Sequence, residues 1–243
     1  MTHIVAIGGG EIAERETERI DRRVVAAADG ASPTALFVPT ASGDAAGYCE
    51  RFHRYYGDEL GCETTVLRLV DDPDGDDAVE RKIAAADLVY VGGGDTGALL
   101  DRWRERGVAE RLRTAAQDGT LLAGLSAGAL CWFDGGLADA VPDAEYGPLD
   151  ALGWVDGLRF TPHAHAERRR AFADALCGTG ATGLALTDRA AVEIRDDEFR
   201  ILTGGDDAAA YLLVDVGGRV VIERVEATSF RPLDDLGYRF GAD

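Results

Sequence analysis

The sequence predicts an α/β protein in which helices cover both faces of a mainly parallel sheet. Its 243 residues, 46% of them hydrophobic, are enough for one large core. Strand and helix signals alternate through most of the chain, which is typical of a parallel sheet with crossover helices. Beyond residue 178, short β segments follow one another, so we expect antiparallel strands added to that sheet. We therefore expect one three-layer α/β/α domain spanning residues 1–243.

The first half of the chain alternates apolar runs with amphipathic segments. The apolar runs predict four strands, over residues 3–7, 35–38, 65–70 and 88–91. The amphipathic segments predict three helices, over residues 18–28, 44–60 and from residue 96 onward. Ser42 is placed to cap the helix over 44–60. The aromatic residues of that helix recur at helical spacing, which predicts that they pack in the core.

The second half begins with a strand over 121–125 and a helix near Ala127. The later β segments are expected at 191–194, 199–202, 210–214 and 220–225. The Val216-Gly217-Gly218 stretch is typical of a hairpin turn.

Gly124-Leu125-Ser126-Ala127-Gly128 fits the G-x-S-x-G pattern of a nucleophile elbow. The apolar strand before it and the helix after it are the context that this motif requires. Gly124 and Gly128 remove side chains that would clash around a strained serine backbone. The alternative is a simple helix cap, which needs a serine but no paired glycines. We therefore predict that Ser126 is a nucleophile.

A serine nucleophile needs a base, and the chain has four histidines. His3 lies at the amino end of the first strand, whereas active sites of parallel sheets gather at carboxyl ends. His53 lies within the helix over 44–60. His163 and His165 follow an expected strand, and their spacing leaves the choice between them open. For the oxyanion hole, the N–H group of Ala127 is the first candidate, and Gly93 or Gly94 is the second.

Composition excludes several other classes of protein. The net charge of −19, with Lys82 as the single lysine, disfavours nucleic acid and suits a salt-rich cytoplasm that screens self-repulsion. No apolar run approaches the roughly 20 residues of a membrane helix, and the N-terminus lacks a signal peptide, so we expect a cytoplasmic protein. The four scattered cysteines form no metal or disulfide pattern. We expect no metal and no cofactor.

Two glycine loops also satisfy the dinucleotide fingerprint. They are Gly8-x-Gly10-x-x-Ala13 and Gly92-x-Gly94-x-x-Gly97. That fingerprint needs an acidic residue at the end of the next strand to bind ribose. Neither strand ends in Asp or Glu, so nucleotide binding is disfavoured.

Several segments together resemble peptidase family S51, the aspartyl dipeptidase (dipeptidase E) and cyanophycinase group. They run in family order through most of the chain: 37–44, 91–96, 124–129, and 161–163 followed by Glu167-Arg168-Arg169. The resemblance implies a class I glutamine amidotransferase-like fold. It also implies Ser126 as nucleophile, His163 as base, and an oxyanion hole from the glycine loop and Ala127.

The acidic member of the triad has two candidates under this resemblance. We favour Asp188, near the end of a later strand, over Asp139, which follows the Ser126 helix, because a strand end is held more rigidly. The role needs a buried carboxylate on the far imidazole nitrogen. Arg168 and Arg169 are candidates for binding the acidic side chain of a substrate.

The expected function is that of a serine peptidase cleaving short peptides, in particular dipeptides with an N-terminal aspartate. The partner is a small peptide, and a homodimer is compatible with the sequence. The alternatives are a non-catalytic binding protein on the same fold and a glutamine amidotransferase-like protein. For the latter, Cys131 lies too far along the helix to replace Ser126.

Overall fold

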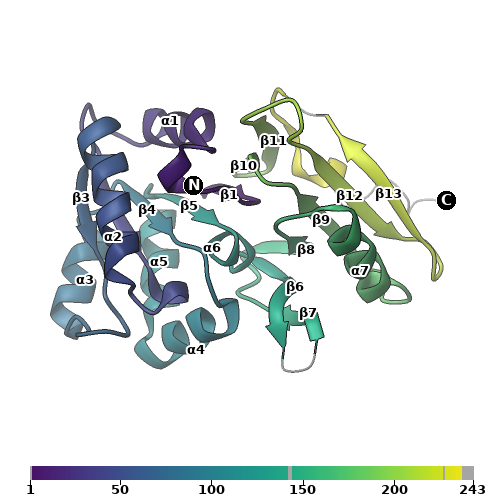
Figure 1. Cartoon of the computed structure of the whole chain (residues 1–243), viewed down its shortest axis with the longest axis horizontal. Coiled ribbons are helices and arrows are strands. Elements are labelled where there is room, and N and C mark those ends of the chain that lie inside the picture. Colours follow the sequence, from purple (N-terminus) through teal and green to yellow (C-terminus); the bar gives the residue numbers. More distant parts are fainter. Residues whose placement is uncertain (1, 142–143, 227, 237–243) are drawn as a thin grey trace.

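An eight-stranded sheet forms the central layer of the computed structural model, which describes residues 2–141, 144–226 and 228–236 (Figure 1). Its strand order is β14-β11-β10-β1-β5-β4-β2-β3. The parallel strands are β1 (His3–Ile7), β2 (Thr34–Val38), β3 (Glu63–Val66), β4 (Leu88–Val91) and β5 (Leu121–Leu125). Three strands extend the sheet in antiparallel pairing: β10 (Ala190–Arg195), β11 (Glu198–Thr203) and β14 (Arg231–Pro232).

Helices cover both faces of this sheet, as alternation along the strands requires. On one face, α1 (Glu18–Ala27), α2 (Ala46–Phe52) and the π-helical η3 (His53–Glu59) pack on the side chains of Val5, Ile7 and their neighbours. On the other face, α3 (Asp76–Ala84), α4 (Thr96–Arg106) and α5 (Val108–Gln117) pack on Ile4, Ala6 and theirs. The predicted three-layer α/β/α class is confirmed.

A second, six-stranded sheet lies beside the first, with the order β13-β12-β9-β8-β6-β7 (Figure 1). It contains β6 (Phe133–Val141), β7 (Ala144–Asp150), β8 (Val155–Thr161), β9 (Thr182–Leu186), β12 (Ala210–Asp215) and β13 (Val220–Val225). Helix α7 (Ala166–Leu176) packs on it. The expected C-terminal antiparallel strands are therefore divided between two sheets. The described residues also form the short 3-10 helices η1 (Ile12–Glu14), η2 (Thr40–Ser42) and η4 (Leu233–Leu236).

The helix after Ser126 is much shorter than a continuous helix would be. Helix α6 covers only Ala127–Leu130, and strand β6 begins at Phe133. Asp139, which was expected simply to follow the Ser126 helix, therefore lies on strand β6. Gly135 and Gly136 allow β6 to approach its neighbours closely, because a Cβ at Gly136 would overlap the backbone of Phe160.

Two local expectations around Asp44 were wrong. Ser42 does not cap a helix; it lies in η2, and its hydroxyl donates to the Pro39 carbonyl at 2.8 Å. The strand expected over 65–70 ends at Val66, because the chain then wraps around the buried Asp44 carboxylate. That carboxylate accepts hydrogen bonds from the N–H groups of Leu69, Val70 and Asp71 at 2.6, 2.6 and 3.2 Å.

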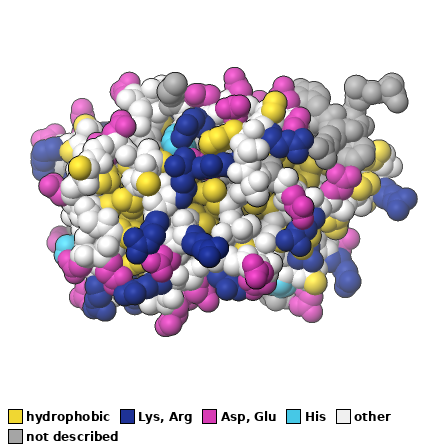
Figure 2. Space-filling view, turned by 90° about the horizontal axis from the view of Figure 1, so that it is seen from above, with side chains coloured by type: hydrophobic (Ala, Val, Ile, Leu, Met, Phe, Trp, Pro, Cys, Tyr) yellow, Lys and Arg dark blue, Asp and Glu magenta, His cyan; other side chains and the backbone are white. Residues whose placement is uncertain are grey.

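The charged side chains lie on the surface, with acidic and basic groups interspersed over the face seen in Figure 2. No helix in the described part of the chain is long and apolar enough to cross a membrane. Glu193, on β10, is one of three exceptions among the described acidic residues, with Asp21 and Asp44, because its side chain is buried. It pairs with His3 at 3.0 Å, Arg23 at 3.1 Å and Arg200 at 2.6 Å.

The pairs around Glu193 tie β1, α1 and β11 to β10. Burial by itself raises the pKa of this carboxyl, but the hydrogen bonds from His3, Arg23 and Arg200 outweigh burial and lower the pKa from 4.5 to about 2. The folded state therefore favours the ionised form. The stabilisation is fully present above the unfolded pKa, and it is lost as the pH falls through the folded pKa.

We predict that Glu193→Gln destabilises the protein at pH 7 and that this difference shrinks by about 3 kcal/mol as the pH falls from about 5 to about 2. The amide cannot neutralise the guanidinium groups of Arg23 and Arg200, whereas the wild-type carboxylate is protonated only at low pH. Urea unfolding of both proteins across this range measures the difference. If the difference in unfolding free energy between the two proteins does not change with pH, the lowered pKa of Glu193 is contradicted.

Candidate functional site

The carboxyl ends of five strands from the two sheets meet at one place. In the first sheet, β5 pairs with β1 and β4, and the register sets Leu125 beside Ile7 and Gly124 beside Val91. In the second sheet, β8 and β9 run parallel, with Thr161 beside Ala185. The segments that follow these strands therefore converge, as expected for a site in an α/β sheet.

Ser126 lies in the turn between β5 and α6 with a strained backbone. Its φ and ψ angles are 56° and −111°, a backbone conformation that residues other than glycine rarely adopt. Backbone hydrogen bonds hold this turn from both sides. The Ser126 N–H group donates to the Ile7 carbonyl at 3.0 Å, and the Ser126 carbonyl accepts from Ala129 and Leu130 at 2.9 Å each. The sequence pattern for a nucleophile elbow therefore corresponds to an elbow in the structure.

The two glycines that flank Ser126 are needed for backbone approach. A Cβ atom at Gly124 would overlap the carbonyl of Gly128, and a Cβ at Gly128 would overlap the carbonyl of Val91. Any other residue at either position would push α6 away from β4 and β5. The reason given from the sequence for these glycines thus agrees with their surroundings.

Ser126, His163 and Asp188 form one continuous hydrogen-bonded chain. The Ser126 Oγ atom lies 2.9 Å from Nε2 of His163, and Nδ1 of the same ring lies 2.6 Å from Oδ1 of Asp188. His163 follows β8 and has a left-handed backbone, with φ of 48°. Asp188 lies in the turn between β9 and β10. This arrangement can remove a proton from the serine hydroxyl while the carboxylate orients the ring.

Asp188 is more exposed than the role of a buried carboxylate would suggest, with 56% of its side chain accessible. The expectation of a buried carboxylate was wrong because the β9–β10 turn lies at the surface. The hydrogen bond from His163 nevertheless lowers the pKa of Asp188, so this group is the ionised partner of the ring. Asp139, the other candidate, pairs instead with the guanidinium of Arg168.

Three successive carbonyls at the end of β1 hold this chain of side chains in place. The Ile7 carbonyl accepts from Ser126. The Gly8 carbonyl accepts from the N–H group of His163 at 2.8 Å, and the Gly9 carbonyl accepts from the N–H group of Arg189, next to Asp188, at 3.0 Å. Gly9 also makes room for the imidazole–carboxylate pair, since a Cβ there would overlap Asp188 Oδ1 and the His163 ring. The first glycine loop thus positions the site, a role that its sequence did not reveal.

The candidates for the oxyanion hole lie on two loops beside Ser126. Gly93 is close enough that a Cβ there would lie 3.4 Å from Cβ of Ser126. Its N–H group points to the Tyr48 hydroxyl at 3.4 Å. Among the described residues, the backbone N–H groups of Gly94 and Ala127 donate no hydrogen bond to another protein group. Gly94 lines the cavity over Ser126, whereas Ala127 is buried directly after Ser126.

A cavity of about 250 Å³ opens over Ser126 and His163. Its walls also contain residues that the sequence did not single out for a site: Gly10, Glu11, Ile12, Tyr48, Arg51 and Leu125. Tyr48 was expected only to pack in the core, and its ring does pack against Phe37 with centroids 4.9 Å apart. Burial, the main cause, raises the pKa of Tyr48 to about 12, so its hydroxyl stays protonated at neutral pH.

Arg168 and Arg169 do not line this cavity, so the expectation that they reach the substrate was wrong. The Arg168 guanidinium is almost completely buried and is bonded to Thr161, Asp139 and the Leu137 carbonyl. Arg169 lies over the ring of Tyr211, with its Cζ 4.2 Å from the centroid. Both therefore tie α7 to the second sheet.

The remaining histidines have structural contacts. His165 caps α7, where its ring accepts from the N–H group of Arg168, and it also contacts the Tyr146 hydroxyl at 3.2 Å. His3 pairs with Glu193, and Nδ1 of His53 lies 2.5 Å from the Thr64 hydroxyl. Spacing alone left the choice between His163 and His165 open. Their contacts distinguish them, because His163 contacts Ser126 and His165 does not.

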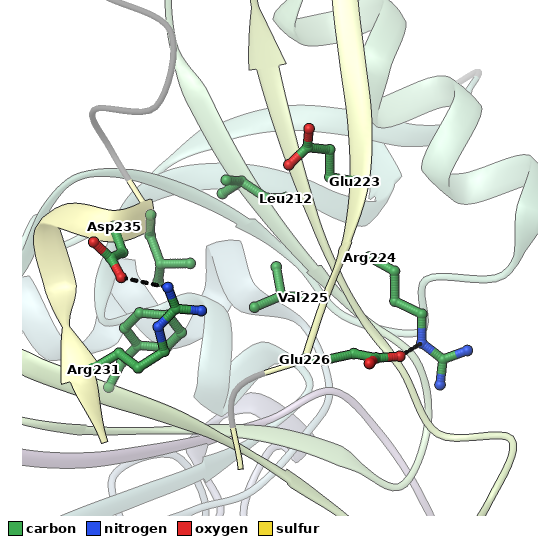
Figure 3. A pocket seen from close by; sticks show the side chains of 9 residues that line it. Leu212, Glu223, Arg224, Val225, Glu226, Arg231 and Asp235 are labelled. Carbon is green, nitrogen blue, oxygen red and sulfur yellow. Dashed lines mark ion pairs between the residues drawn. The ribbon is translucent and has the colours of Figure 1, made fainter. Parts of the chain in front are cut away.

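Other reactive groups and cavities offer less chemistry. Cys131 is fully buried, its thiol donates to the Gly128 carbonyl, and burial raises its pKa well above the usual value, so it is unsuited to attack. No group of three or more His, Cys, Asp or Glu residues in the described ranges could hold a metal ion. A second cavity of about 250 Å³ lies between β12, β13 and η4 (Figure 3). Its arginines pair with its own acids, Arg231 with Asp235 and Arg224 with Glu226.

Comparisons with known proteins identify the family and agree with the fold. The profile of peptidase family S51 matches residues 4–202, and the chain belongs to this family. A curated relative, the uncharacterized peptidase YgaJ of Bacillus subtilis strain 168, is 35% identical over 219 residues, which cover 87% of this chain and 91% of the relative. Family membership and this relative support a peptidase.

Two solved structures share the fold. A peptidase from an acI-B1 actinobacterium superposes with a TM-score of 0.69 at 20% identity, covering 96% of this chain and 97% of the other. A candidate peptidase E protein from Listeria monocytogenes EGD-e superposes with a TM-score of 0.62 at 18% identity, covering 93% and 100%. The chain therefore has a class I glutamine amidotransferase-like fold.

We predict that Gly9→Ala slows reaction at Ser126 by about a hundredfold or more, because the added methyl group separates His163 from Asp188. The rate of labelling by a fluorophosphonate measures this effect, and thermal unfolding reports the accompanying loss of stability. Gly75→Ala is the matched control, since a Cβ there meets nothing within 4 Å. If fluorophosphonate labels the Gly9→Ala variant as fast as it labels the wild-type protein, the positioning role of Gly9 is contradicted.

Proposed function

We propose that the protein is a serine-type peptidase in which Ser126 is the nucleophile, His163 the general base and Asp188 the orienting carboxylate. One observation carries the proposal. Unbroken contacts of 2.9 and 2.6 Å link the serine hydroxyl through the imidazole to the carboxylate, at the floor of an open cavity. Membership of peptidase family S51 supports a peptide as substrate.

The reaction follows from these contacts in two halves. Ser126 Oγ attacks the scissile carbonyl carbon while its proton moves to His163 Nε2. The imidazolium then gives this proton to the leaving nitrogen, the C–N bond breaks, and an ester to Ser126 remains. A water molecule loses a proton to His163 and attacks the ester. The ring finally returns the proton to Ser126 Oγ as the second product leaves.

Negative charge develops on the carbonyl oxygen in both halves. The N–H groups of Ala127 and Gly94 are our candidates for binding it, because neither donates elsewhere in the described chain. Gly93 would contribute once its N–H group turns from the Tyr48 hydroxyl, to which it makes a long contact of 3.4 Å. Asp188 stabilises the imidazolium that forms in each half.

The cavity suits a short peptide. Its volume of about 250 Å³ has room for a few residues at most. The resemblance to the aspartyl dipeptidases leads us to propose dipeptides with an N-terminal aspartate as substrates. A cationic group in the cavity would be required for such a substrate, and Arg51 is available there.

We predict that Ser126→Ala lowers kcat for a cleaved dipeptide by at least about a thousandfold and abolishes fluorophosphonate labelling. The loss arises because no other group forms the acyl-enzyme. A panel of Asp-X, Asn-X and Ala-X dipeptides, assayed in low and high salt, measures the activity and its preference. Cleavage that survives Ser126→Ala would contradict the proposed nucleophile, and the absence of any cleavage would contradict a peptidase.

We further predict that Asp188→Asn lowers kcat by about a thousandfold to ten-thousandfold, because the amide no longer selects the right tautomer of His163. Asp139→Asn should lower kcat by less than about threefold, since its carboxylate pairs with Arg168 and not with the imidazole. Both variants are compared in kcat and in thermal unfolding. The reverse order of effects on kcat would make Asp139 the acid.

A further inference from the structure

Two side chains of opposite charge line the cavity that contains Ser126. Glu11 follows the glycine loop at the end of β1, and Arg51 lies on α2. Both residues are exposed and line the cavity. Neither takes part in the contacts of Ser126, His163 and Asp188, so neither belongs to the catalytic machinery described above.

Neither charge is neutralised by a neighbouring side chain. Glu11 forms no ion pair among the described residues; its backbone N–H group, not its carboxylate, is bonded to Glu16. The Arg51 guanidinium has one ring contact, with its Cζ 5.6 Å from the centroid of Tyr48. Most other arginines in the described chain, in contrast, pair with acids, as Arg168 does with Asp139.

The Tyr48 side chain connects the cation to the reacting centre. Its ring lies beneath Arg51 within the range of a cation–π interaction, and its hydroxyl reaches the N–H group of Gly93, next to Ser126. The ring is itself held by Phe37. The Tyr48 ring therefore positions Arg51 at one side of the cavity, where the described residues give its guanidinium no acceptor.

We propose that Arg51 binds a carboxylate of the substrate and that Glu11 binds its free α-ammonium group, so that the site selects unblocked, acidic dipeptides. The inference rests on the proposed peptidase function and names its specificity residues. A planar guanidinium can donate two parallel hydrogen bonds to a carboxylate, and a carboxylate can accept from an ammonium. The carboxylate is either the side chain of an N-terminal aspartate or the C-terminus of a dipeptide.

Binding measurements separate this inference from catalysis. In the Ser126→Ala background, Kd is measured by calorimetry for Asp-Leu, Asn-Leu, N-acetyl-Asp-Leu and Asp-Leu amide. Asp-Leu should bind at least about tenfold more tightly than N-acetyl-Asp-Leu. It should also bind at least about tenfold more tightly than either Asn-Leu, which lacks the side-chain carboxylate, or Asp-Leu amide, which lacks the C-terminal carboxylate. Adding Arg51→Gln should remove the preference for that carboxylate. Adding Glu11→Gln should remove the preference for the free amino group.

Matched controls lie one turn or less away. Arg54→Gln and Glu14→Gln change exposed residues that do not line the cavity, and both should leave every Kd unchanged. If Arg51→Gln removes the discrimination between Asp-Leu and Asn-Leu, Arg51 binds the aspartate side chain. If it removes the discrimination between Asp-Leu and Asp-Leu amide, Arg51 binds the C-terminal carboxylate.

Several outcomes would overturn the inference. It fails if Asp-Leu does not bind, if Arg51→Gln or Glu11→Gln weakens all four peptides equally, or if the control variants change the preferences as much. The proposed function fails on a different result, the absence of peptide cleavage and of Ser126 labelling in the wild-type protein. Labelled, active protein with unchanged preferences in both cavity variants would leave the peptidase standing and refute these specificity residues.

Discussion

The geometry of the site depends on the carboxyl end of β1. Carbonyls of three successive residues there accept hydrogen bonds from the segments that carry Ser126, His163 and Asp188. These segments come from different strands of two sheets, and a single stretch of backbone is their common reference. Because β1 lies inside the larger sheet, paired with β5 on one side and β10 on the other, it cannot shift without disturbing the core. The rigid centre of the fold thus sets the positions of groups that must lie within hydrogen-bond distance of one another.

Close backbone approach is the second condition of this arrangement. Gly9 leaves space for the imidazole and the carboxylate, and Gly124 and Gly128 let the Ser126 turn sit against β4. The left-handed conformations at Ser126 and His163 are unfavourable in isolation. They persist because backbone hydrogen bonds and packing on both sides determine them. The two glycine-rich loops that resemble nucleotide fingerprints therefore have a different physical role here. Gly9 leaves space for the side chains of His163 and Asp188, and Gly94 lets its loop approach the backbone of Ala41.

The cavity above these groups carries charges of both signs, and this combination suits a small zwitterionic molecule better than an extended polypeptide. Arg168 and Arg169, which follow His163 along the chain, belong to the packing of α7, whereas Arg51, on α2, lines the cavity. Arg51 could not be selected from sequence, because one exposed arginine on an amphipathic helix looks like any other. Tyr48 was hidden for a related reason: an aromatic residue at helical spacing predicts core packing, and here the ring packs against Phe37 while the residue also lines the cavity.

Local patterns by themselves determined the fold class and the elbow. Apolar periodicity, strand and helix alternation and the G-x-S-x-G turn depend on residues that are neighbours in the chain, so the three-layer architecture and Ser126 followed from sequence. The number of histidines reduced the partners of Ser126 to two. Tertiary structure supplied what spacing left open: His163, which the family resemblance indicated, contacts Ser126, and Asp188, the favoured acid, contacts His163, whereas Asp139 pairs with Arg168. It also decided that Arg51 is the arginine that lines the cavity. Each of these outcomes depends on strand register and on contacts between distant segments, and no local pattern encodes them.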